Sequence, residues 1–301
     1  MNLLITGAWR HTPEQLNTLR QMGHTVMEMP DERGALPCSP DWVEGVICNG
    51  LFLHHPIETF TSLTYVQLTS AGFDRMPMGY AREKGMTVHN ARGVYSIPMA
   101  EFALSSVLAV YKQSRYFSAA QSGHRWDKHR GLRELFGKRV CIVGCGHVGT
   151  ECAVRFAAMG CEIIGVDAYP HEAEPYSVML PVPALDTALM TADVVILTLP
   201  LTQETHHLMG RAQLERLPDG CVLVNIARGG VMDTEALIEA LQARRITAVL
   251  DVFEDEPLGA DSPLWDLDNA FLTPHNSFVG EGNAERLYRV IYGHLDAHIR
   301  K

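Results

Sequence analysis

Short apolar runs alternate with amphipathic segments along the whole chain, a pattern typical of α/β proteins. In the first third, five such runs predict strands at the spacing of βα units: residues 2–6, 25–29, 45–48, 65–69 and 86–88. A helix is predicted from Thr12 to about Met22, because Thr12, Pro13 and Gln15 combine an N-cap, a first-turn proline and a capping-box glutamine. The first 95 residues are therefore expected to form a small α/β domain.

A longer apolar stripe follows the first domain. It begins at Pro98 and predicts a helix to about Phe117 that links this domain to a second one. The stripe comprises Met99, Phe102, Ala103, Val107, Val110 and Tyr111. Residues 121–136 carry Trp126 among charged residues, so we expect an excursion whose indole either belongs to the core or reaches a partner subunit.

The second half repeats the α/β pattern. Strands are expected at residues 140–143, 162–166, 193–199, 222–226, 247–252 and 270–273, with helical stretches between them such as 234–244. This alternation predicts a doubly wound parallel sheet. A last stripe predicts a helix that returns to pack on the first domain; it comprises Leu287, Val290, Ile291, Leu295 and Ile299. We thus expect two Rossmann-like or flavodoxin-like α/β domains.

A glycine motif stands at the first turn of the second half. Gly144, Gly146 and Gly149 follow the strand at 140–143 with the spacing G-x-G-x-x-G, and a helix opens directly behind them. Gly144 allows the tight turn, Gly146 lets the backbone approach a pyrophosphate, and Gly149 lets helix and strand pack closely. Asp167 ends the next strand, where its carboxylate can accept hydrogen bonds from both hydroxyls of an adenosine ribose and would repel a 2′-phosphate. The motif therefore predicts a site for NAD rather than NADP.

Cysteine and histidine residues also occur in this motif. Cys141, Cys145 and His147 could suggest a metal site, but no fourth ligand stands at metal-binding spacing. We therefore expect no metal and interpret them as packing and loop residues. The chain has seven cysteines, mostly inside apolar runs, as is typical of reduced thiols in a cytoplasmic protein.

Charge and hydropathy narrow the possible partners. The chain has 301 residues and a formal net charge of −10, with acidic and basic residues interspersed, which argues against nucleic acid and against an anionic membrane surface. The apolar start of the chain is too short for a signal peptide, and no apolar run reaches transmembrane length. We therefore expect a cytoplasmic protein with two cores of ordinary size.

Three side chains just after strands of the second half suggest acid–base chemistry. Ligands of open parallel sheets bind beyond the carboxyl ends of the strands, where Arg228, Glu256 and His275 are expected. An arginine binds a carboxylate bidentately, a histidine exchanges protons near neutral pH, and a glutamate can hold the imidazolium. Together they suit a 2-hydroxy acid, whose hydroxyl proton the histidine would take. The alternative interpretation is that all three are solvated or structural residues, since periodicity alone does not bring them together.

Beyond these residues, the chain resembles the D-isomer-specific 2-hydroxyacid dehydrogenases over nearly its whole length. Four segments are similar to the signatures of that family: Pro200-Leu201-Thr202 with Thr205, residues 225–230, residues 250–253 with Glu256-Pro257, and Thr273-Pro274-His275. The resemblance implies a discontinuous substrate-binding domain of residues 1–96 and 282–301, hinged to an NAD-binding Rossmann domain of residues 97–281. It also implies a homodimer formed through the NAD-binding domains, and we place Trp126 on the dimer arm.

The resemblance further implies a role for each matching residue. Arg228 binds the substrate, His275 is the general acid/base, and Glu256 is the partner of the histidine. Implied cofactor contacts come from Ser96, Gly144, Gly146, His147, Val148, Gly149, Asp167, Leu199, Pro200, Thr205, Ala227, Arg228, Asp251 and His275. Asp251 resembles the acid near the nicotinamide carboxamide. Implied substrate contacts come from Ala71, Gly72 and Arg228, and from Asn49, Gly50 and Leu51, where backbone N–H groups would hold the substrate carboxylate.

Departures from the family pattern bear on the substrate. Phosphoglycerate-oxidising members usually place an arginine in the loop occupied here by residues 49–52, and without it a phosphate has no evident partner. After His275 the family often continues with glycines, whereas this chain has Asn276, Ser277 and Phe278. We expect an NADH-dependent reductase of a small unphosphorylated 2-keto acid such as glyoxylate, hydroxypyruvate or an apolar analogue. The alternatives are a phosphoglycerate dehydrogenase-type activity, oxidation of formate or phosphite, and a non-enzymatic NAD sensor similar to the C-terminal-binding corepressors.

Overall fold

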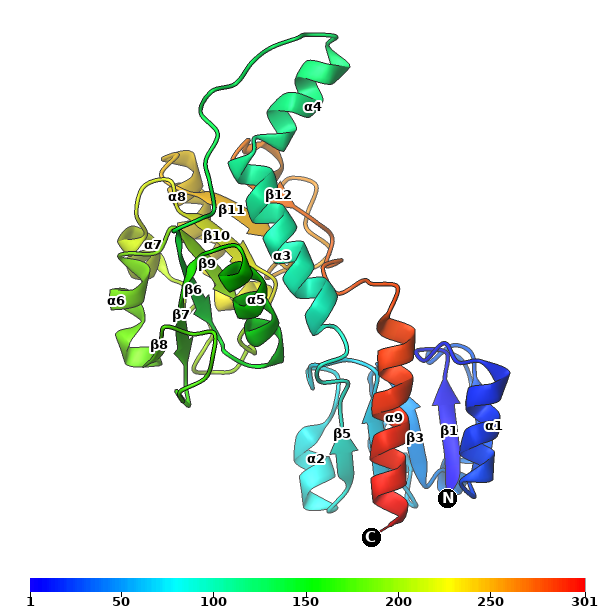
Figure 1. Cartoon of the computed structure of the whole chain (residues 1–301). Helices are drawn as coiled ribbons and strands as arrows, with labels where there is room; N and C mark the ends of the chain where they lie inside the picture. Colours follow the sequence, from blue (N-terminus) through cyan, green and yellow to red (C-terminus); the bar gives the residue numbers. More distant parts are fainter. Residues whose placement is uncertain (301) are drawn as a thin grey trace. The chain divides into compact units, whose positions relative to one another are not determined.

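The chain divides into two compact units in the computed structural model, which describes residues 1–300 (Figure 1). Unit 1 combines residues 1–95 with the segment that starts at Gly280, and unit 2 is Ser96–Val279. Each unit is built around a parallel sheet with helices packed on it, which confirms the predicted fold class.

The sheet of unit 1 has five parallel strands in the order β2-β1-β3-β4-β5. The strands are β1 (Asn2–Thr6), β2 (Thr25–Met29), β3 (Gly45–Cys48), β4 (Tyr65–Leu68) and β5 (Thr87–His89). All five strands were predicted, and β5 begins one residue later than expected. Its start is delayed because the N–H of Met86 donates to the carbonyl of Ala81, so that pairing with the sheet begins at Thr87.

Helices cover both faces of this sheet. Helix α1 (Pro13–Gln21) begins at the predicted capping box, in which Gln15 N donates to Thr12 Oγ1 at 3.3 Å and Thr12 N donates to Gln15 Oε1 at 3.0 Å. Helix α9 (Asn283–Ile299) is the predicted return helix and packs with α1 against one face of the sheet. Its buried residues are Leu287, Ile291 and Leu295. Helix α2 (Met78–Glu83) contributes to the core on the opposite face.

The sheet of unit 2 has seven parallel strands in the order β12-β11-β10-β9-β6-β7-β8. They are β6 (Arg139–Val143), β7 (Glu162–Asp167), β8 (Val178–Pro181), β9 (Val194–Leu197), β10 (Val222–Asn225), β11 (Thr247–Leu250) and β12 (Ala270–Leu272). Strand β8 was not predicted. It is a short edge strand that ends in Pro181, and proline is tolerated at an edge because no ladder partner needs its N–H. The strand order reverses between β6 and β9.

Helices cover both faces of the second sheet as well. Helices α3 (Ser96–Tyr111) and α5 (His147–Ala158) lie side by side on one face (Figure 1). Helices α6 (Leu185–Leu189), α7 (Arg211–Arg216) and α8 (Thr234–Gln242) bury their apolar sides against the other face. The carboxyl ends of the strands therefore lie together at one edge of the sheet, between the two layers of helices.

The prediction of one continuous helix from Pro98 to Phe117 is wrong. Helix α3 ends at Tyr111, and a separate helix α4 (Ser114–Ser122) projects from the sheet (Figure 1). The break occurs at Gln113, whose φ of 54° lies in the left-handed region and stops the α3 hydrogen-bond ladder. The side chain of Trp126, which follows α4, is 93% exposed, so the alternative that its indole belongs to the core is also wrong.

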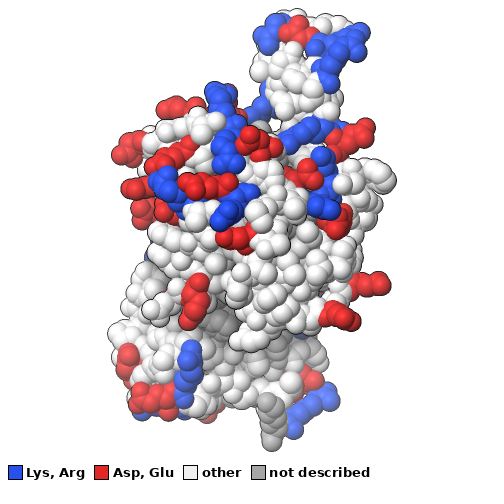
Figure 2. Space-filling model, turned by 90° about the vertical axis from the view of Figure 1, so that its left-hand side faces the viewer, with Lys and Arg blue, Asp and Glu red and all other residues white. Residues whose placement is uncertain are grey.

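Charged side chains of both signs are interspersed on the face shown in Figure 2. Ion pairs at the surface of the chain include Arg139 with Glu162 at 2.9 Å and Arg245 with Asp219 at 2.9 Å. Within residues 1–300, no helix combines the length and the hydropathy needed to cross a bilayer.

Candidate active site

The glycine motif forms the turn between β6 and α5, at the point where the strand order reverses. Gly144 has a φ of 94°, and a Cβ atom there would lie 2.6 Å from the backbone nitrogen of Leu199. A Cβ on Gly149 would lie 2.1 Å from the carbonyl oxygen of Gly144. Gly146, the N-cap of α5, differs from both because a Cβ there would meet no atom within 4 Å. The turn thus packs tightly on the protein side and stays open beside Gly146, which fits a pyrophosphate at the helix N-terminus.

Asp167 is held directly beside this turn. Its Oδ2 accepts a hydrogen bond from Cys145 N at 2.7 Å, and its Oδ1 accepts one from Tyr169 N at 2.9 Å. The half-buried carboxylate therefore has a fixed position at the carboxyl end of β7. This is the place from which an acid can bind the adenosine ribose of a dinucleotide.

The cysteines near the turn are packing residues. Cys141 and Cys145 are buried, and burial raises the pKa of Cys145 to about 11, which keeps it a neutral thiol. All seven cysteines of the chain are free. Within residues 1–300, one cluster of three side chains, His206, His207 and Glu254, has metal-ligand types within 4.8 Å of one another. These side chains are exposed, and His207 and Glu254 are hydrogen-bonded to each other.

The segment after β9 lies against the glycine turn. Thr198 donates from its hydroxyl to the carbonyl of Gly144 at 2.5 Å, and Leu199 is buried next to it. The hydroxyl of Thr205 accepts from Thr202 N at 2.7 Å and donates to the carbonyl of Pro200 at 2.7 Å. Thr205 therefore fixes the turn that carries the predicted cofactor residues.

Asn225 positions the arginine after β10. Its fully buried side chain accepts from Ala227 N at 3.0 Å and donates to the carbonyl of Arg228 at 3.0 Å. The half-buried Arg228 donates from Nη1 to the carbonyl of Ala227 at 2.8 Å. No role had been expected for Asn225, although a polar residue inside an apolar strand run is a recognisable signal of a buried hydrogen-bonded side chain.

Asp251, directly after β11, organises the loop that carries the histidine. Its fully buried carboxylate accepts hydrogen bonds from Thr273 Oγ1 at 2.6 Å, Asn276 N at 2.7 Å and Ser277 N at 2.9 Å. The carbonyl of Asp251 also accepts from His275 N at 2.8 Å. Asn276 and Ser277, which follow His275 where the family often has glycines, thus donate to this carboxylate from their backbone. A contact between Asp251 and the nicotinamide carboxamide stays a prediction.

His275 and Glu256 form a direct pair beyond the carboxyl ends of β11 and β12. Nδ1 of His275 lies 2.7 Å from Oε2 of Glu256, and Oε1 of Glu256 accepts from Phe253 N at 3.0 Å. A carboxylate only accepts, so Nδ1 carries the proton and Nε2 is the atom left to exchange one. The His275 side chain is 40% exposed, and the ring of Phe278 meets it edge-on at 6.0 Å between centroids. This pair stands beside Arg228 in strand order, because β10, β11 and β12 are neighbours.

In unit 1, the loop after β3 does not present its N–H groups as expected. Asn49 N donates to Oε1 of Glu32 and Gly50 N donates to Oε2 of Glu32, both at 2.7 Å. Thr6, at the end of β1, adds a hydroxyl donor to Oε1 at 2.7 Å. Asn49 and Gly50 could bind a substrate carboxylate through these groups only by displacing Glu32. Leu51, the third residue of this loop, is buried.

The loop after β4 differs from the loop after β3 in its backbone hydrogen bonds. The carbonyl of Ala71 accepts from Asn90 Nδ2 at 2.5 Å and that of Gly72 accepts from Ser70 Oγ at 3.0 Å. The N–H groups of Ala71 and Gly72 make no hydrogen bond to any of residues 1–300. They are therefore donors to which a ligand can bind. Ser96, a predicted cofactor contact, is the buried first residue of α3 in unit 2.

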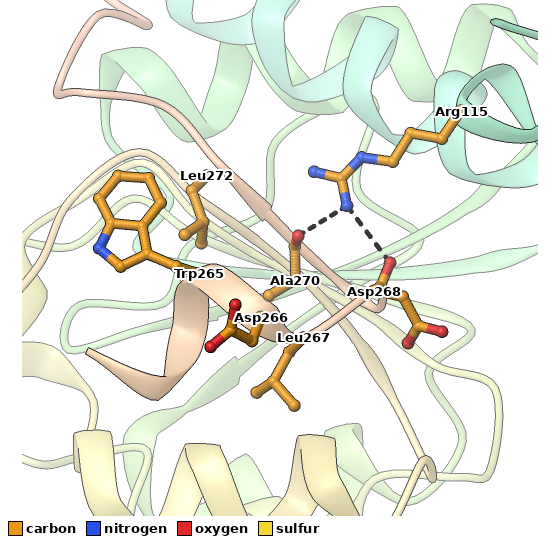
Figure 3. A pocket seen from close by; sticks show the side chains of 7 residues that line it. All are labelled: Arg115, Trp265, Asp266, Leu267, Asp268, Ala270 and Leu272. Atoms are coloured by element: carbon orange, nitrogen blue, oxygen red, sulfur yellow. Dashed lines mark hydrogen bonds between the residues drawn. The ribbon is translucent and has the colours of Figure 1, made fainter. Parts of the chain in front are cut away.

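A cavity of about 340 Å³ lies elsewhere in unit 2 (Figure 3). Its lining residues are Arg115, Trp265, Asp266, Leu267, Asp268, Ala270 and Leu272. Figure 3 shows the Arg115 guanidinium directed at the carbonyls of Asp268 and Ala270, to which it donates at 3.2 and 2.8 Å. These contacts anchor α4 beside the start of β12, whereas His275 follows the end of that strand. None of the predicted site residues lines this cavity.

Comparison with known proteins places this geometry in a family. Residues 104–277 match the family described as D-isomer specific 2-hydroxyacid dehydrogenase, NAD binding domain. A D-3-phosphoglycerate dehydrogenase of Methanocaldococcus jannaschii is 36% identical over 256 residues, which cover 81% of this chain and 48% of that protein. A hydroxypyruvate reductase of Thermotoga maritima is 34% identical over 241 residues, covering 78% of this chain and 76% of that protein.

A solved structure supports the same placement. The crystal structure of a D-isomer specific 2-hydroxyacid dehydrogenase family protein from Aeromonas salmonicida subsp. salmonicida has a TM-score of 0.84 and 27% identity, over 98% of this chain and 95% of that one. The match to the Methanocaldococcus jannaschii protein spans about half of that relative's length. The family match includes the glycine turn, Asp167, Arg228, Glu256 and His275. The chain therefore belongs to the D-isomer-specific 2-hydroxyacid dehydrogenase family, and residues 104–277 are its NAD-binding domain.

Proposed function

We propose that the protein reduces a small, unphosphorylated 2-keto acid to the corresponding 2-hydroxy acid with NADH. The observation that carries this proposal is the His275–Glu256 pair, held beyond the carboxyl ends of β11 and β12 next to Arg228. Bound NADH supplies the hydride that reduces the keto carbon. The name of the Thermotoga maritima relative, hydroxypyruvate reductase, supports a substrate of this size.

Residues of unit 2 bind the substrate and transfer the proton. Arg228 binds the substrate carboxylate through its guanidinium and polarises the keto group. His275 donates the proton on Nε2 to the keto oxygen, and Glu256 stabilises the protonated imidazole through Nδ1. In the oxidative direction the same nitrogen takes the hydroxyl proton. Asp251 and Asn225 position these groups through the loops after β11 and β10.

A substrate panel tests the proposal. NADH oxidation is measured with glyoxylate, hydroxypyruvate, pyruvate, longer apolar 2-keto acids and phosphohydroxypyruvate, and each series is repeated with NADPH. Saturable turnover of an unphosphorylated 2-keto acid with NADH supports the proposal. Turnover confined to phosphohydroxypyruvate would favour the activity named for the Methanocaldococcus jannaschii relative. Tight NADH binding with no turnover would favour a sensing role.

We also propose that the protein acts as a homodimer in which Trp126 contacts the second subunit. Trp126 is 93% exposed and Phe136, at the end of the same segment, is 78% exposed, so two large apolar side chains face solvent in the single chain. Trp126→Ala is expected to weaken the dimer or to change the substrate constants. A Trp126→Ala protein that stays dimeric with unchanged constants would exclude a role for this indole at the neighbouring site.

A further inference from the structure

The sheet of unit 1 has its own topological switch point. In the order β2-β1-β3-β4-β5, the direction of winding reverses between β1 and β3. Open parallel sheets bind ligands in the crevice beyond the carboxyl ends at such a point. In this chain, Thr6 ends β1, and Asn49 and Gly50 directly follow β3.

The carboxylate of Glu32 occupies this position beyond the ends of β1 and β3. Two consecutive backbone N–H groups, from Asn49 and Gly50, each donate to one carboxylate oxygen of Glu32 at 2.7 Å. The hydroxyl of Thr6 donates to the same carboxylate at 2.7 Å. The carbonyl of Glu32 is in turn 3.0 Å from Nε2 of His55, which fixes the loop after β2. Two adjacent N–H groups with a hydroxyl form an anion-binding site, and in this chain the bound anion is the carboxylate of Glu32.

The internal carboxylate changes which ligands the crevice accepts. Donors that already bind Glu32 cannot bind a phosphate or carboxylate of a ligand, and a second anion close to Glu32 is repelled. A hydroxyl group of a ligand can donate to a free lone pair of the Glu32 carboxylate. Arg75 brings a positive charge to the same loop, since its Cδ would lie 3.7 Å from a Cβ on Gly50. Whether the loop repels a second anion therefore depends on the charge of Glu32 against that of Arg75.

We propose that Glu32 is a specificity-determining residue that excludes 2-keto acids with a second anionic group and favours those with a neutral, hydroxyl-bearing end. The inference rests on the proposed function, because it concerns the substrate of that same reaction. Within unit 1, it assigns the carboxylate of the substrate to the N–H groups of Ala71 and Gly72, which make no hydrogen bond within residues 1–300. It places the far end of the substrate toward Glu32.

The test compares two substrates that differ by one phosphate. The ratio of kcat/KM for hydroxypyruvate to kcat/KM for phosphohydroxypyruvate is measured with NADH for the wild type and for Glu32→Gln. We expect the wild-type ratio to exceed about ten and to fall about tenfold in Glu32→Gln. Asp31→Asn is the matched control, because hydrogen bonds from the side chain and backbone of Arg33 lower the pKa of Asp31 to about 2 and its exposed carboxylate is equally charged. An unchanged ratio in Glu32→Gln, or a wild type that prefers phosphohydroxypyruvate, would overturn the inference.

A binding measurement separates this inference from the proposed reaction. Thermal unfolding is followed with and without inorganic phosphate for the wild type, Glu32→Ala and Asp31→Asn. Phosphate is expected to raise the Tm of Glu32→Ala more than that of the wild type or of Asp31→Asn, because only Glu32→Ala vacates the N–H groups of Asn49 and Gly50. Equal shifts in all three proteins, or none in Glu32→Ala, would overturn the role of Glu32 even if keto acids are reduced. If no 2-keto acid is reduced by the wild type, the proposed function fails, and the phosphate result alone decides whether Glu32 excludes anions.

Discussion

Nδ1 of His275 lies 2.7 Å from Oε2 of Glu256, although the two residues are 19 positions apart in the chain. The contact exists because β11 and β12 are neighbouring parallel strands whose carboxyl ends meet at one edge of the sheet. The second oxygen of Glu256 is held by Phe253 N, so the carboxylate cannot rotate away without losing that bond. The imidazole is therefore oriented with Nε2 as its remaining proton-exchanging atom, and the proposed proton transfer requires this orientation.

Asp251→Asn tests the loop that holds His275. An asparagine offers one acceptor oxygen in place of two, and its NH₂ group would face a backbone N–H of Asn276 or Ser277. We expect unit 2 to lose about 1–3 kcal/mol of unfolding free energy and kcat to fall, since a buried donor is left unsatisfied. Urea unfolding and steady-state kinetics measure both. The exposed Asp268→Asn is the control and should cost no more than about 0.5 kcal/mol; equal losses in the two variants would contradict this account.

Gly146→Ala and Gly149→Ala separate cofactor binding from folding. A Cβ on Gly149 would lie 2.1 Å from the carbonyl oxygen of Gly144, so this variant is expected to lose both stability and NADH affinity. A Cβ on Gly146 meets no atom within 4 Å, so that variant should unfold like the wild type but bind NADH at least about tenfold more weakly. Thermal unfolding and NADH fluorescence titration distinguish the two. Unchanged NADH affinity in Gly146→Ala would show that the pyrophosphate does not approach this turn.

Asp167→Ala tests the preference for NADH. Removal of the carboxylate takes away the acceptor for the ribose hydroxyls and the charge that repels a 2′-phosphate. We expect NADH affinity to fall by about tenfold or more while NADPH affinity changes much less. Because Cys145 N also loses its acceptor, both titrations are compared as a ratio to the wild type. Equal losses for the two cofactors would overturn the assignment of Asp167.

His24→Gln tests the pH dependence of unit 1. Burial, and secondarily the charge of the N-terminus, lowers the pKa of His24 below the ordinary value of 6.5. A base whose folded pKa is depressed binds fewer protons in the folded chain than in the unfolded chain, so stability is lost as pH falls through 6.5. The wild type should therefore lose more stability than His24→Gln between about pH 7.5 and about pH 5.5.

Hydrogen exchange of β1 peptides during urea unfolding reports on unit 1 alone. His171→Gln is the control, because His171 lies in unit 2, on which this measurement does not report. Parallel pH profiles for the wild type and His24→Gln would mean that another group dominates. His294, whose pKa burial also lowers, is the next residue to replace.

Local signals made most of the fold predictable from the sequence. The capping box of Thr12 and Gln15, the strand runs and the glycine spacing depend on neighbours within a few positions, and the structure confirms them. The break at Gln113 was missed because a left-handed backbone conformation at a non-glycine residue has no signal in the apolar pattern, and the contact of Arg115 with the carbonyl of Ala270 lies 155 positions away. No periodicity reports such a contact.

The candidate site was likewise only partly predictable from the sequence. The pattern of apolar runs could place Arg228, Glu256 and His275 at the ends of strands. Their grouping in one site came only from the family resemblance, because neither segment indicates by its own sequence that β11 pairs with β12. Glu32 was missed because its partners, Asn49 and Gly50, lie 17 and 18 positions away and use only their backbone. Backbone donors leave no trace in the residue types of a sequence.

We predict that His275 transfers the proton in the reduction of a 2-keto acid. The most direct test measures NADH oxidation with hydroxypyruvate by the wild type and by His275→Gln, together with NADH affinity by fluorescence titration. We predict that kcat falls by about a hundredfold or more in His275→Gln while the Kd for NADH stays nearly unchanged. A His275→Gln protein that turns over hydroxypyruvate at the wild-type rate would contradict the account.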